Sequence, residues 1–125
     1  MEMISNEEKI TQAVLVSVDT GDYDAEASLA ELKELVKSAG AEPVFTVTQN
    51  LKRPETGTYV GTGKLQEIAD ICKQQEIDLL VFDCELSPTQ IRNIEAETDT
   101  RTIDRTMLIL DIFALRARSK EGKLQ

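Results

Sequence analysis

The sequence predicts an α/β fold: a four-stranded parallel sheet with helices on both faces, a Rossmann-like three-layer sandwich. Short apolar runs alternate four times with longer segments of helical spacing, the order expected of a parallel sheet. Two of these runs, residues 13–18 and 79–82, lack polar alternation, which is typical of strands covered on both faces. The other two are more polar and suit edges. Right-handed crossovers then favour the strand order 2-1-3-4.

The first half of the chain supplies two strands and the helix between them. The central strand at 13–18 precedes a helical segment with an apolar side, for which Ser28 and Glu31 form a capping box and Gly40 a stop. The second strand, residues 43–47, begins with a proline, which suits an edge position.

The second half repeats the pattern. A helix is expected at 64–75, and the central strand 79–82 follows. Ser87 as cap, Pro88 at the first position and Gln90 at the third position start the next helix. A half-polar strand at 100–103 leads into an apolar helix from Arg105.

That last helix is apolar on more faces than one small domain can cover. We expect one stripe to pack on the sheet and another to need a neighbour. The sequence therefore predicts an interdomain interface made by residues Leu108, Ile109, Ile112, Phe113, Leu115 and Arg116. If this neighbour is missing, the chain is expected to self-associate through the helix.

Residues 1–12 are interpreted as an N-terminal extension, 13–118 as the α/β domain, and 119–125 as the start of a linker. Residues 1–99 hold 8 Lys and Arg against 20 Asp and Glu, so the body is a poor non-specific partner for nucleic acid. The two cysteines show no metal-binding or CxxC spacing, which indicates a reducing, cytoplasmic setting. No apolar run approaches a membrane span.

The most distinctive loop contains Gly61, Thr62, Gly63 and Lys64 just before a predicted helix. Backbone N–H groups at such a position can approach a phosphate, and Lys64 adds positive charge. The spacing does not match a Walker A loop, because a leucine follows the lysine and no glycine lies at the required distance before Gly63. An ordinary loop with Thr62 or Gly63 as helix cap remains the alternative.

Asp19 and Asp83 end the two central strands, next to the topological switch point where ligands bind in such sheets. Their carboxylates are candidate ligands for Mg²⁺, although acidic residues also simply solvate loop ends. The chain has no histidine and no GxSxG turn, so no nucleophile, base and orienting group are expected to assemble. We therefore predict no catalytic residue within this chain.

Three ordered motifs resemble the N-terminal domain of the HflX family of ribosome-associated GTPases. The first runs from Tyr59 to Ile68 and the second from Phe82 to Glu95. The third runs from Ile103 through Ala114 and Arg116–Arg118 to Gln125. The match extends from about residue 13 to the end of the chain.

The resemblance implies a protein with this α/β domain, a helical segment and a GTPase domain, which binds the large ribosomal subunit and helps split or rescue ribosomes. It implies GTP and Mg²⁺ as cofactors of that whole protein, with the chain's own helical and GTPase domains as partners. This chain contains no Walker A, DxxG or NKxD motif, so GTP hydrolysis is not expected in these residues. The alternative is a free-standing nucleotide- or Mg²⁺-binding switch module that uses Gly61–Lys64, Asp19 and Asp83.

Overall fold

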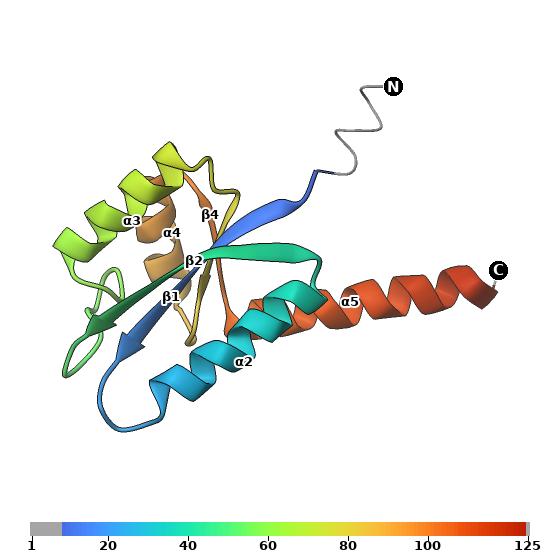
Figure 1. The fold of residues 1–125 in the computed structure, drawn as a ribbon, viewed down its shortest axis with the longest axis horizontal. Helices are drawn as coiled ribbons and strands as arrows, with labels where there is room; N and C mark the ends of the chain where they lie inside the picture. The colour runs from blue at the N-terminus through green and yellow to red at the C-terminus, as the bar shows by residue number, and fades with distance from the viewer. Residues whose placement is uncertain (1–8, 125) are drawn as a thin grey trace.

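The computed structural model describes the backbone of residues 9–124 and shows the predicted parallel sheet (Figure 1). Its strands are β1 (Thr11–Asp19), β2 (Ala41–Asn50), β3 (Leu79–Phe82) and β4 (Arg101–Asp104), in the order β2-β1-β3-β4. All three pairings are parallel. The predicted strand order is therefore confirmed, with β1 and β3 in the centre. β1 begins at Thr11, so the predicted boundary after residue 12 falls inside a strand.

Four helices alternate with these strands: α2 (Ala25–Ser38), α3 (Thr62–Gln74), α4 (Pro88–Thr98) and α5 (Arg105–Leu124). Alternate residues of β1 belong to two separate cores. Val14, Val16 and Val18 pack with apolar residues of α3 and α4. Ala13 and Leu15 pack with apolar residues of α2 and α5. The two sides of one strand thus assemble the two outer layers of the sandwich, because successive side chains point to opposite faces of a sheet.

The observed N-caps show that sequence patterns predicted the start of α4 correctly and the start of α2 incorrectly. α4 begins as predicted: the Ser87 hydroxyl accepts from the Gln90 N–H at 3.1 Å, and Gln90 Oε1 accepts from the Ser87 N–H at 2.9 Å. The predicted capping box of Ser28 and Glu31 is wrong. α2 begins a turn earlier, at the cap Asp24, whose Oδ1 accepts from the Ala27 N–H at 3.0 Å. Ser28 and Glu31 are freed for another contact, with Arg105.

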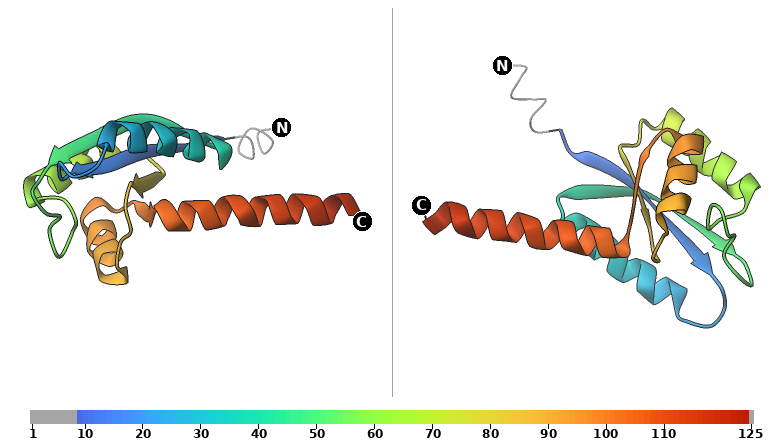
Figure 2. Two further views of the ribbon diagram at one scale, coloured as in Figure 1. Left: turned by 90° about the horizontal axis from the view of Figure 1, so that it is seen from below. Right: turned by 180° about the vertical axis from the view of Figure 1, so that it is seen from behind.

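α5 continues well past the body of the sandwich and forms a projecting arm (Figures 1 and 2). The helix runs unbroken through residue 118, where a linker was expected to begin. No helix in the described part of the chain combines the length and apolarity needed to cross a membrane.

Candidate functional site

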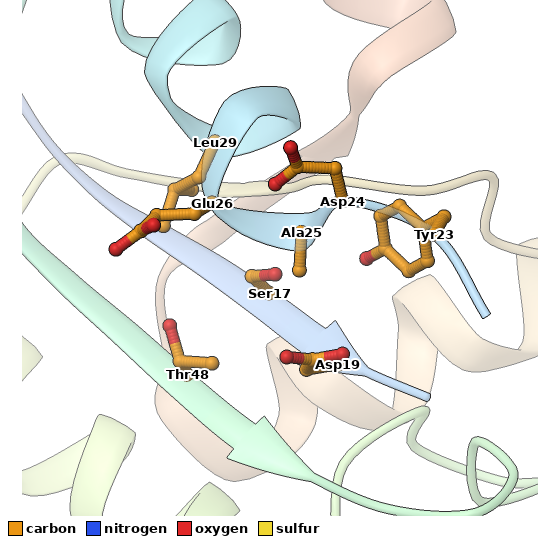
Figure 3. Close-up of a pocket in the computed structure, with 8 residues that line it drawn as sticks. All are labelled: Ser17, Asp19, Tyr23, Asp24, Ala25, Glu26, Leu29 and Thr48. Carbon is orange, nitrogen blue, oxygen red and sulfur yellow. The ribbon is translucent and has the colours of Figure 1, made fainter. Parts of the chain in front are cut away.

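The carboxyl edge of the sheet carries a hollow of about 540 Å³ over the start of α2 (Figure 3). It is lined by Ser17, Asp19, Tyr23, Asp24, Ala25, Glu26, Leu29 and Thr48. Ser17 and Thr48 are direct partners in the β1–β2 register, so their hydroxyls lie side by side on the face that α2 covers. The carboxylates of Asp19, Asp24 and Glu26 make the rim of this hollow acidic. The arrangement repels a phosphate group by simple Coulomb interaction.

Asp19 and Asp83 do end β1 and β3 at the same edge, as predicted, but their surroundings differ. Asp19 is half-buried, and its Oδ1 accepts from the Gly21 N–H at 2.9 Å. Asp83 is buried, and its Oδ1 pairs with Nη1 of Arg105 at 2.5 Å. Among the side chains that the structure describes, no three acidic or cysteine residues are grouped closely enough to hold a metal ion. The magnesium site stays a prediction, and the guanidinium beside Asp83 counts against it because it already compensates that charge.

Arg105 is the functional residue that sequence reasoning missed. Its guanidinium contacts Asp83 at the end of β3 and both Ser28 and Glu31 on α2. Its main-chain N–H donates to the Cys84 carbonyl at 3.2 Å. The sequence signal for it was a single arginine between a predicted strand and an apolar helix. A charged side chain is buried at such a place only if it is paired, so this arginine indicates an ion pair.

The segment Gly61–Lys64, predicted as a loop just before a helix, forms the start of that helix. Gly61 is the N-cap of α3, and Thr62, Gly63 and Lys64 form the first turn of that helix. The prediction of Thr62 or Gly63 as the cap is therefore wrong. The Gly61 N–H donates to Gln49 Oε1 at 2.9 Å, and Lys64 Nζ pairs with Glu67 at 3.1 Å. Phosphate binding here stays a prediction. The pairing of Lys64 with a carboxylate lowers the positive charge that it would offer.

Two side-chain amides on α4 hold the loop between β2 and α3 in place. Gln90 Nε2 donates to the Thr56 carbonyl at 3.1 Å, and Asn93 Nδ2 donates to the Gly57 carbonyl at 2.9 Å. These contacts position Tyr59, whose ring meets Phe82 edge-on with 6.3 Å between centroids. The loop therefore covers the end of β3 on the α3–α4 side.

Cys84 lies behind this loop and is poorly suited to nucleophilic chemistry. Burial, with smaller contributions from nearby carboxylates such as Asp104 and Asp83, raises the pKa of the Cys84 thiol to about 12. Burial also raises the pKa of the Tyr59 hydroxyl. Both side chains stay protonated at neutral pH and act as uncharged packing groups.

α5 divides the predicted interface residues into two groups. Leu108 and Ile112 are buried in the core that α5 shares with α2. Phe113 is 62% exposed, and Leu110, which the prediction omitted, is 61% exposed. Leu115, which was also predicted for this interface, is 41% exposed. Ile109 is half-buried, and the side chain of Arg116 lies outside the described residues.

The fold defines a class of protein: a parallel α/β domain with helices on both faces of its sheet and a projecting final helix. Comparison with known proteins identifies the family. The model for the GTP-binding GTPase N-terminal family matches residues 26–114. The chain belongs to this family, and the resemblance to HflX N-terminal domains is confirmed.

Curated relatives carry the same domain inside longer proteins. The chain is 51% identical over 125 residues to a GTPase HflX of Lacrimispora saccharolytica, covering 99% of the chain and 30% of the relative. It is 50% identical to GTPase HflX of Escherichia coli over 91% of the chain and 27% of that relative. The chain thus spans less than a third of the length of these two proteins.

Solved structures agree with the fold. The complex of SsGBP with GDP superposes with a TM-score of 0.66 at 30% identity, over 91% of this chain and 32% of that one. A GTP-binding protein from Sulfolobus solfataricus, also in complex with GDP, gives 0.61 at 27% identity, over 85% and 31%.

Proposed function

We propose that this chain is the regulatory and ribosome-docking N-terminal domain of an HflX-type GTP-binding protein. In this proposal the whole protein works in the cytoplasm, binds the large ribosomal subunit and helps split or rescue ribosomes. The domain positions the helical segment and senses the nucleotide state through contact with the GTPase domain. Family membership and the share of the relatives' length that the chain spans support this reading.

The observation that carries the proposal is the apolar surface of α5. Leu110 and Phe113 of α5 expose most of their area. The far end of this helix projects from the sandwich (Figure 2). Covering one such side chain contributes roughly 1.5–3 kcal/mol, so this surface favours a contact with another domain. We expect the helical segment or the GTPase domain of the same protein to supply that contact.

GTP and Mg²⁺ belong to the GTPase domain in this proposal. The chain contains no Walker A motif, and the hollow at its strand ends is lined by the carboxylates of Asp19, Asp24 and Glu26. Such a lining does not fit a triphosphate. The chain therefore contributes binding and orientation to the whole protein, and its own residues do not perform the hydrolysis.

The test uses the full-length protein with Leu110→Glu and Phe113→Glu combined. We expect co-sedimentation with large ribosomal subunits, and the GTP hydrolysis that they stimulate, to fall severalfold. Phe45→Glu is the matched control, because Phe45 is 42% exposed on the opposite face of the sheet, beside Val14 in the β1–β2 register.

Unchanged binding and unchanged stimulated hydrolysis in the α5 variant would refute the proposal. The alternative of a switch module makes a different prediction. It requires ATP or Mg²⁺ to bind the isolated chain in calorimetry, with binding lost on Lys64→Ala or Asp19→Asn.

A further inference from the structure

The N-terminal end of α5 is held by two adjacent residues, Asp104 and Arg105, which contact different parts of the fold. Asp104 is buried, and its Oδ1 accepts from the Met107 N–H at 2.9 Å, which caps the first turn of α5. Its Oδ2 accepts from the Leu86 N–H at 2.8 Å, in the segment that leads into α4. One carboxylate therefore fixes the start of α5 to the segment that leads into a helix on the other face of the sheet.

Arg105 makes the complementary set of contacts on the α2 side. Its Nη1 lies 2.5 Å from Asp83 Oδ1 and 3.3 Å from Ser28 Oγ, and its Nη2 pairs with Glu31. A planar guanidinium fixes direction as well as distance when it binds several acceptors at once. These contacts join β3, α2 and α5 at one point.

The charge balance shows why this contact resists replacement. The Asp83 side chain is 1% exposed, and its Oδ2 has no hydrogen-bond partner among the described residues. Arg105 is the cation paired with it. A buried carboxylate is stable only when its charge is compensated, so release of Arg105 is strongly disfavoured.

Apolar packing alone holds α5 less specifically. Within the described side chains, Leu108 and Ile112 are the buried apolar residues of α5, and both lie in its first half. Apolar contacts are non-directional, so they attach the helix without fixing the angle of its far end. A small rotation at the N-terminal end is amplified along a helix that continues to Leu124.

We propose that Asp104 and Arg105 form a pivot that sets the direction of α5, with Arg105 as the positioning residue. The pivot goes beyond the proposed function, because it concerns the geometry of α5 whatever partner the helix contacts. In this proposal α5 is a rigid helix, and the position of its far end depends on the positions of β3 and α2.

The experiment measures the direction of α5 by electron–electron spin distances in the full-length protein. Labels at Lys33 on α2 and Ala117 on α5 span the pivot, and labels at Lys33 and Lys73 on α3 do not. All three positions are exposed. Labels attached through an unnatural ketone side chain leave Cys72 and Cys84 unmodified.

In Arg105→Met we expect the 33–117 distance distribution to shift or to broaden at least twofold, while the 33–73 distribution keeps its position and width. Arg101→Met is the matched control, because Arg101 is exposed on β4 and makes no ion pair among the described residues.

A second variant covers the case in which Arg105→Met fails to fold. Arg105→Met combined with Asp83→Asn removes the buried charge together with its partner, so the fold is retained more readily. The 33–117 distribution should still shift or broaden in this variant. A distribution as narrow as wild type, at the same distance, in every folded Arg105 variant would overturn the pivot and assign the direction of α5 to Leu108 and Ile112.

Discussion

At the scale of single residues, the same chemical group has different roles according to what covers it. Asp19 and Asp83 both follow the end of a central strand or form it. The Asp19 carboxylate accepts a hydrogen bond from Gly21 in its own loop, whereas the Asp83 carboxylate pairs with the guanidinium of Arg105. Burial and partners decide these roles, and neither can be read from residue type.

Cys84 gives a pH prediction with a definite sign. Its pKa rises from an ordinary 9.0 to about 12, so the folded protein keeps the proton where the unfolded chain loses it. The stabilising contribution is complete below pH 9 and is lost as pH rises toward 12. We expect Cys84→Ala to flatten the fall of unfolding free energy over this range, measured by urea denaturation.

The same shift predicts slow chemistry at Cys84. In a Cys72→Ser background, native Cys84 should react with a disulfide reagent at pH 8 at least about tenfold more slowly than the unfolded chain, because less thiolate is present and the thiol is buried. Equal rates in the folded and unfolded protein would contradict the protonated, buried thiol.

At the scale of elements, α4 shows how one side chain can start a helix and hold a distant loop. Gln90 Oε1 completes the capping box with Ser87, while Gln90 Nε2 donates to the carbonyls of Thr56 and, at 3.4 Å, Glu55. The cap is local in sequence, and the tether crosses more than thirty residues.

Substitution of Gln90 separates these two contributions. Gln90→Glu keeps the acceptor for the cap but replaces the donor by a carboxylate oxygen facing carbonyls, so we expect a loss of about 1 kcal/mol of unfolding free energy. Gln90→Ala removes both and should cost about 1 kcal/mol more. Thermal or urea unfolding measures both changes. Equal stability of Gln90→Glu and the wild type would show that the loop tether contributes nothing.

At the scale of the whole molecule, charge and apolar surface act in opposite directions. The chain carries a net charge of −9, which favours separation of copies, while Leu110 and Phe113 favour contact. Salt screens the charge repulsion between copies and leaves the apolar attraction in place. The balance therefore depends on ionic strength.

We predict concentration-dependent self-association of the isolated chain through α5, stronger at 0.5 M than at 0.05 M salt, where the Debye length falls by about threefold. Sedimentation velocity at several concentrations is the measurement. Leu110→Glu with Phe113→Glu should give a monomer, and Phe45→Glu should behave as the wild type. A wild-type monomer at all concentrations would show that this surface is too small to pair with itself.

The sequence by itself determined the elements whose signals are local. The apolar runs gave the strands, the two uninterrupted runs gave the central pair, and Ser87, Pro88 and Gln90 gave the start of α4. Periodicity also placed Leu108 and Ile112 on one shared face of α5, and the structure buries both in the core. These features depend on backbone propensity and on residues close together along the chain.

Only the tertiary structure decided the features that rest on distant partners. Ser28 and Glu31 have the spacing of a capping box, but Asp24 caps α2 and they contact Arg105, more than seventy residues later. The segment before α3 was predicted from its glycines alone, and the structure adds a distant partner, because the Gly61 N–H donates to Gln49 on β2. The free energy of a buried charge or amide depends on which groups the fold brings beside it, and sequence spacing carries no record of that partner.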